Sequence, residues 1–218
     1  MRTLIAVVAG GAAILLASAI EAAPDAGFDA ELAAVQQAWA VANYENNGDA
    51  RERALESLEV TASVLAARNP DRAEALIWKG IVESTHAGAK GGLGALSLAR
   101  KARASLETAL ELDPTSLEGS AYTSLGTLYY KVPGFPIGFG NRDKAEELLR
   151  KALEINPNGI DPNFFYGELQ YERGNYAEAL RSLEKASRAA SRPGRELADR
   201  GRRGEIASVT AKVRAKMS

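Results

Sequence analysis

Residues 163–186 read NFFYGELQYERGNYAEALRSLEKA, and this stretch decides the fold. Apolar and small residues recur in it at helical spacing on both sides of Gly174. A glycine at this point ends one helix, and the polar Asn175 begins the next. Gly167 and Ala179 are small enough to let two antiparallel helices approach closely. The stretch therefore predicts a helical hairpin.

The same arrangement occurs twice more upstream. AYTSLGTLYY (121–130) is followed by KAEELLRKALEINP (144–157), and AEALIWKGIVES (73–84) by ARASLETALELDP (102–114). Each second segment ends at a proline, where a helix must stop. Residues 28–46 and 49–67 have the pattern of a degenerate first pair. The chain is therefore predicted to be a series of helical hairpins.

Two of these hairpins carry extra residues between their helices. Ten surround the sequence AGAKGGLGAL (87–96), and seven belong to KVPGFPIGFG (131–140). Both insertions occupy the same turn of the repeat, so we expect them to project as loops from one edge and to be able to touch. In the second, Phe135, Ile137 and Phe139 either fold back onto the helices or form an exposed contact patch.

The second helices share the pattern A-x-x-x-L-x-x-A-L-E-x-x-P, which starts at Ala102 and again at Ala145. With the hairpin at Gly167, this pattern resembles the tetratricopeptide repeat family over residues 71–191. The resemblance implies an all-α fold, a right-handed α-α superhelix of helical hairpins with a capping helix at its C-terminal end. The two Gly/Pro-rich insertions also look like those of the T component of tripartite (TRAP) transporters. That resemblance implies a periplasmic accessory protein that binds the transporter's solute receptor.

The N-terminal segment has the layout of a cleavable signal. Arg2 precedes 17 uncharged residues, from Leu4 to Ile20, and small residues then lead to Pro24. Because a membrane-spanning helix needs about 20 strongly apolar residues, we interpret residues 1–23 as a signal peptide and expect a periplasmic or secreted protein. A retained anchor is the alternative, and it would be the chain's only contact with a membrane. Many T components carry a lipid anchor on a cysteine, and this chain has no cysteine.

The remaining organisation follows from the repeats and the charge. Residues 24–70 form the degenerate pair, residues 71–191 the repeats, and residues 192–218 a basic last helix. Net charge is −1 overall, but residues 188–218 hold nine Lys or Arg against three Asp or Glu. The overall balance gives no attraction to nucleic acid. The basic end is either a binding patch or the solvated face of the capping helix.

The sequence offers no catalytic constellation and no cofactor motif. Its one histidine, His86, has only Glu83 near it at helical spacing, so we expect a capping or solvated side chain instead of a metal ligand. The glycine-rich segment 87–96 lacks the Lys-Ser/Thr ending of a phosphate loop. We therefore predict a protein that is not an enzyme and has no cofactor.

The candidate site is the concave face, which the first helices of the hairpins line in this kind of repeat. Aromatic side chains beside a polar rim suit the recognition of a partner. The residues placed there are Ser120, Thr123, Thr127, Tyr130, Lys131, Asp161, Phe164, Glu168, Tyr171 and Glu172, with Glu74, Ile77, Ile81, Ser84 and Thr85 from the hairpin before. Alternatively Phe164, Ile77 and Ile81 are ordinary core between repeats.

Two functions follow from this surface. The first is an exported interaction module or scaffold that binds a protein or an extended peptide, as an accessory to a solute-binding-protein transporter or as a homo-oligomer. The second is a small-molecule binding or delivery protein whose cavity is closed by the two inserted loops. An enclosed apolar cavity would favour the second, and an open, wet groove the first.

Overall fold

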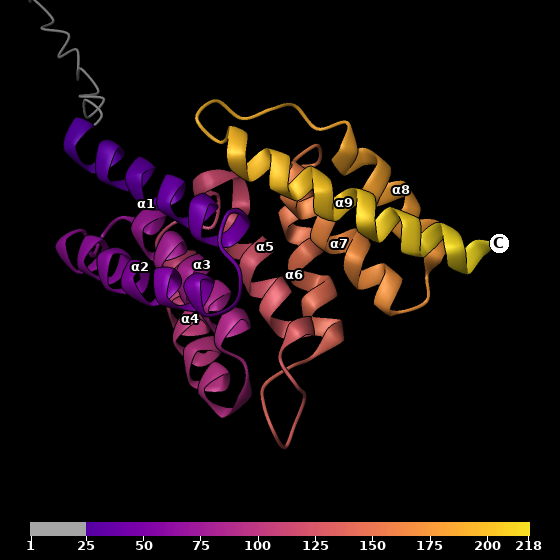
Figure 1. The fold of residues 1–218 in the computed structure, drawn as a ribbon, viewed down its shortest axis with the longest axis horizontal. Helices are drawn as coiled ribbons and strands as arrows, with labels where there is room; N and C mark the ends of the chain where they lie inside the picture. Colours follow the sequence, from indigo (N-terminus) through magenta and orange to yellow (C-terminus); the bar gives the residue numbers. More distant parts are fainter. Residues whose placement is uncertain (1–24) are drawn as a thin grey trace, which may run out of the picture.

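The computed structural model describes residues 25–218, and the named elements of this part of the chain are all α-helices (Figure 1). The predicted signal peptide, residues 1–23, lies outside the described residues. The helices are α1 (Ala26–Tyr44), α2 (Gly48–Arg68), α3 (Ala73–Lys90), α4 (Gly92–Leu112), α5 (Ser116–Lys131), α6 (Arg142–Ile155), α7 (Ile160–Glu172), α8 (Tyr176–Ser187) and α9 (Glu196–Met217). From residue 25 onward, none of them is long and apolar enough to cross a membrane.

Consecutive helices pack in pairs, and the closest pairs are α3–α4, α5–α6 and α7–α8. In each, a glycine of the first helix faces a leucine of the second, and a side-chain carbon on the glycine would lie within 3.0 Å of the leucine Cγ. The pairs are Gly80–Leu106, Gly126–Leu149 and Gly167–Leu183, at 2.6, 2.8 and 2.9 Å. The carbonyl oxygen of the alanine four residues before each leucine lies 3.2 Å from the same point. This recurring geometry confirms the predicted repeat register.

The first insertion does not form a loop, so that prediction is wrong. α3 continues to Lys90 and α4 begins at Gly92, which leaves one residue between the two helices. Gly91 and Gly92 have φ angles of 65° and 60°, a left-handed conformation that favours glycine. Alanine has the highest helix propensity. The inserted alanines therefore lengthen both helices, and the glycines alone make the turn.

The second insertion is a true loop, residues 132–140, which projects beyond α5 and α6 at the bottom of Figure 1. Gly140 N donates to Pro133 O at 2.9 Å and closes the loop at its base. Phe139 folds back, with its ring edge-on to Tyr129 at 5.5 Å between centroids. Phe135 and Ile137 remain 94% and 66% exposed. The loop therefore shows both predicted alternatives: Phe139 folds back onto the helices, and Phe135 and Ile137 are exposed.

The two insertions also meet, as their common place in the repeat predicts. A side-chain carbon on Gly138 would lie 3.3 Å from Leu96 Cδ1, at the start of α4. The guanidinium of Arg103, further along α4, lies 5.1 Å from the centroid of the Phe139 ring. The lengthened α4 therefore supports the base of the loop.

The last helix does more than cap the repeats. In its C-terminal half, Ile206, Val209 and Val213 are buried against α7 and α8. In its N-terminal half, Ala198 joins the core formed by α1, α2 and α3. α9 therefore crosses from the α1 side of the molecule to the α8 side (Figure 1). The predicted capping helix also joins the two ends of the superhelix.

Candidate functional site

A groove of about 1340 Å³ lies between the first helices of the hairpins and the segment that leads into α9. α1 contributes Gln36, Trp39 and Asn43; α3 Trp78, Ile81, Ser84 and Thr85; α5 Leu117, Glu118, Ser120, Thr123, Ser124, Thr127, Leu128 and Lys131; and α7 Ile160, Asp161, Pro162 and Phe165. The other lining residues are Arg51, Asn156, Asn158, Gly159, Lys185, residues 188–193, Arg195, Arg202 and Glu205.

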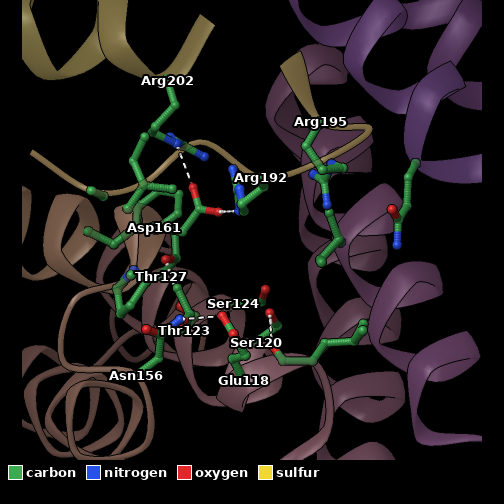
Figure 2. Close-up of a pocket in the computed structure, with 18 of the residues that line it drawn as sticks. Glu118, Ser120, Thr123, Ser124, Thr127, Asn156, Asp161, Arg192, Arg195 and Arg202 are labelled. Atoms are coloured by element: carbon green, nitrogen blue, oxygen red, sulfur yellow. Dashed lines mark hydrogen bonds and ion pairs between the residues drawn. The ribbon is translucent and has the colours of Figure 1, made fainter. Parts of the chain in front are cut away.

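The α5 side of the groove is a row of hydroxyl groups (Figure 2). Thr127 Oγ1 donates to Thr123 O at 2.8 Å, and Ser120 Oγ donates to Leu117 O at 2.6 Å. Helical Ser and Thr commonly donate backwards in this way. Each oxygen still has a lone pair free to accept. This wall therefore offers hydrogen-bond acceptors to a ligand.

The first turn of α5 has an unusual backbone. Leu117, Glu118 and Gly119 have φ angles of 47°, 56° and 74°, a left-handed turn that costs non-glycine residues of order 1 kcal/mol each. Strain of this kind persists where the surrounding structure fixes it. Here Asn156 Nδ2 donates to Glu118 Oε2 at 2.7 Å. The turn holds Leu117 and Glu118 in the groove wall.

The opposite end of the groove is aromatic. Trp39 and Trp78 pack edge to face, with centroids 5.8 Å apart. Trp39 Nε1 donates to Thr85 Oγ1 at 2.9 Å, which fixes its indole. The guanidinium of Arg195 lies 4.8 Å from the Trp78 ring centroid, a cation–π contact. Both indoles are at most 7% exposed, so this end of the groove presents chiefly the positive charge of Arg195.

Above the hydroxyl row, Asp161 lies between two arginines (Figure 2). Arg192 Nη1 and Arg202 Nε donate to its two carboxylate oxygens at 2.6 and 2.8 Å. Arg192 Nε also donates to Asp199 Oδ1 at 2.8 Å. Burial opposes ionisation of Asp161, but the two guanidiniums prevail and lower its pKa to about 2. The ion pairs fasten the segment before α9, and α9 itself, to α7.

Eight of the residues predicted for the concave face line this groove; they are Ile81, Ser84, Thr85, Ser120, Thr123, Thr127, Lys131 and Asp161. Lys131 Nζ lies 2.9 Å from Glu168 Oε1 and 3.2 Å from Glu172 Oε1. Its charge is therefore compensated. The predicted face and the observed groove overlap along α3 and α5.

The predicted aromatic anchors are not available, and this part of the prediction is corrected. Tyr130 is 6% exposed and Phe164 3% exposed. Tyr130 Oη donates to Glu168 Oε2 at 2.7 Å, within the contact between α5 and α7. Arg202 of α9 covers Phe164, with its guanidinium 4.6 Å from the ring centroid. Both rings are core, and Ile77 is fully buried as well.

Glu168, Tyr171 and Glu172 lie beside the groove and do not line it. Tyr171 is half-buried and packs against Tyr176 at 6.0 Å between centroids. Glu172 pairs with Lys131 and, at 3.5 Å, with Arg142. The loop residues Phe135, Ile137 and Phe139 are also absent from the lining. The inserted segments therefore do not close the cavity; the α8–α9 segment covers it instead.

The groove residues that sequence reasoning missed include arginines of the basic C-terminal end. Arg192, Arg195 and Arg202 all face the groove. The excess of basic residues after residue 188 is the signal that points to them. For these three the solvated-face alternative does not hold, because the segment folds back across the concave side.

His86 lies apart from the groove, in a polar contact between α2 and α3. It is 3% exposed, and its Nδ1 lies 2.7 Å from Glu59 Oε2. Its predicted capping or solvated role is therefore wrong. Burial favours the neutral form of Glu59, but hydrogen bonds with His86 and Lys101 lower its pKa overall. Among residues 25–218, no three acidic or histidine side chains gather as metal ligands would.

Comparisons with known proteins agree with this geometry. A family model described as tetratricopeptide repeat matches residues 137–195. The chain is similar to the crystal structure of a thermophilic TPR protein of Thermus thermophilus, with a TM-score of 0.54 and 19% identity, over 83% of this chain and 99% of that one.

Two crystal structures of MamA are also similar, at 19% and 18% identity, with TM-scores of 0.44 and 0.43. They cover 75% and 86% of this chain, and 89% and 92% of their own. A comparison with curated proteins finds no match. Residues 137–195 therefore match the tetratricopeptide repeat family, and the chain around them has the fold of a tetratricopeptide repeat protein.

Proposed function

We propose that this protein is a non-catalytic interaction module whose groove holds an extended segment of a partner protein. The observation that carries this proposal is the composition of the groove, which four successive first helices and the α8–α9 segment line together. Helical-repeat proteins use such concave surfaces for extended partners. The groove, at about 1340 Å³, is also larger than the roughly 300–1,000 Å³ typical of small-molecule sites.

A second candidate is the binding of a small molecule. The observation in its favour is the cover over the groove, which Asp161, Arg192 and Arg202 fasten in place. A covered site shields a small ligand from solvent. The groove also combines a mainly apolar lining with a few hydroxyl and charged groups, as most small-molecule sites do.

Export completes the proposal. We interpret residues 1–23 as the signal that directs the protein to the periplasm or out of the cell. The finer role implied by the T-component resemblance is that of an accessory to a solute-binding-protein transporter. The bound segment would then belong to the solute receptor.

Photocrosslinking separates the two candidates. A benzophenone amino acid at Thr127, in the hydroxyl row, is expected to capture a protein in envelope extracts. The matched control places the same group at Val64, which is 51% exposed on α2 and away from the groove. Equal protein capture at both positions would contradict the proposal. Native mass spectrometry that finds a bound small molecule, with no protein captured at Thr127, would establish the second candidate instead.

A further inference from the structure

We infer that the groove selects segments rich in Asp and Glu, and that Arg51 and Arg195 are the side chains that bind their carboxylates. This inference rests on the proposed function and specifies the chemistry of the partner. It starts from the charge of the groove. Seven Lys or Arg side chains line it against three Asp or Glu, a formal excess of four positive charges.

The excess is concentrated in a few residues. Arg192 and Arg202 pair with Asp161, and Lys131 pairs with Glu168. Within residues 25–218, the other four lining cations have no carboxylate oxygen within 4.0 Å; they are Arg51, Lys185, Arg188 and Arg195. Unlike surface lysines in water, two of these four also have buried polar atoms.

Arg195 is the most constrained of the four. Its Nε is buried and finds no hydrogen-bond partner in the described part of the chain. Burial, together with the nearby charge of Arg192, lowers the pKa of its guanidinium. A buried donor without an acceptor is costly. An anion in the groove would compensate the charge of this guanidinium.

Arg51 repeats the pattern from another element. Its Nη2 donates to Asn43 Oδ1 at 2.5 Å, which holds the side chain against α1, and its Nε is also buried without a partner among the described residues. Arg195 lies on Trp78, and Trp78 contacts Trp39 of α1. Both guanidiniums therefore lie at the end of the groove beside α1. The planar guanidinium fork matches a carboxylate in geometry.

The opposite wall favours a peptide over a free anion. The hydroxyl oxygens of Ser120 and Thr127 donate to helix carbonyls and keep lone pairs to accept. Extended backbone N–H groups are the donors that such a row can bind. An acidic peptide presents N–H groups to this wall and carboxylates to the arginines. A small anion would use only one of the two walls.

The test uses a displayed library of random peptides about 12 residues long, selected on the full mature chain near 150 mM salt, where only short-range charge contacts persist. Peptides selected on the unaltered protein are expected to be enriched in Asp and Glu. Their affinity is expected to fall at least tenfold with Arg195→Gln and with Arg51→Gln. Arg195→Lys retains the charge and is expected to restore part of the loss.

The matched control is Arg100→Gln, on the exposed side of α4, which is expected to leave affinity unchanged. Thermal melts check that each variant is folded. Selected peptides without acidic enrichment, or with affinity unaffected by both groove variants, would refute this inference and leave the proposed function standing. If no peptide is selected, the proposed function fails and the inference with it. Citrate or phosphate that binds through Arg195, with no peptide selected, would assign the groove to small anions.

Discussion

Gly201 of α9 lies directly against the ring of Tyr44 at the end of α1. A side-chain carbon on Gly201 would lie well inside van der Waals contact distance of Tyr44 Cδ1. Burial raises the pKa of Tyr44 to about 12. The contact depends on the absence of a side chain at one position of α9.

Gly201→Ala is therefore expected to weaken the attachment of α9 to α1. Overpacking costs about 1–3 kcal/mol, which exceeds the roughly 0.5–1 kcal/mol that alanine returns in helix propensity. The control is Gly204→Ala in the same helix, where nothing lies within 4 Å of the added carbon. Thermal melts should show Gly201→Ala lower than the unaltered protein and Gly204→Ala equal or higher. The reverse order would show that Tyr44 does not hold α9.

The repeat glycines lead to a second prediction. Gly126→Leu and Gly167→Leu should each unfold or greatly loosen the chain, because the new side chain would enter the space of Leu149 or Leu183. Gly88→Leu, on the exposed face of α3 with nothing within 4 Å, is the matched control and should fold normally. Circular dichroism melts measure all three. Unchanged melting of both repeat variants would contradict the repeat register.

The loop allows a third comparison between two phenylalanines. Phe139→Ser removes a half-buried ring and its contacts with Tyr129 and Arg103, and is expected to cost about 1–3 kcal/mol. Phe135→Ser changes a ring that is 94% exposed and should leave stability within about 0.5 kcal/mol. Urea titration measures both. If Phe135 joins two copies of the chain, a sizing column will show that association lost in Phe135→Ser alone.

The half-buried carboxylate of Asp161 predicts an acid-sensitive fold. Its folded pKa of about 2 lies below the ordinary value of 3.8, so its ionised form stabilises the folded state above pH 4. This contribution, roughly 2 kcal/mol, is lost as the pH falls from about 4 to about 2. Urea midpoints measured across that range for the unaltered protein and for Asp161→Asn isolate it. The gap between them should close at low pH; a constant gap would contradict the assignment.

The signal peptide is tested by the mature N-terminus. Cleavage after the small residues predicts a first residue close to Ile20 or Ala23. N-terminal sequencing of the protein purified from its native envelope measures this. Recovery of a membrane-embedded chain that still begins at Met1 would refute export by a cleaved signal.

Much of the fold is predictable because each helical hairpin is specified by residues that are close together in the sequence. The spacing of Gly126, Leu149 and their equivalents specifies one hairpin within about 40 residues, without reference to the rest of the chain. The first insertion departs from its predicted loop because alanine propensity outweighs the glycine signals there. Gly91 and Gly92 make the turn, and the alanines around them continue both helices.

The site is only partly predictable, because helix periodicity does not separate a groove from an interface between repeats. Thr127 and Tyr130 lie on the same side of α5, yet Thr127 faces the groove and Tyr130 is covered by α7. Phe164 is covered by Arg202, more than 30 residues later in the chain. No local sequence pattern predicts that α9 crosses the concave side.

The contact between α1 and α9 also limits how this protein can change its length. An open superhelix can gain or lose a repeat at either end or in the middle, and its remaining interfaces stay the same. Here an added hairpin would carry Gly201 away from Tyr44 and the segment around Arg195 away from Trp78. The contact between α1 and α9 therefore forms only with this number of hairpins. We expect proteins that share this closure to differ by insertions within their turns, as at residues 132–140, and to keep the repeat count constant.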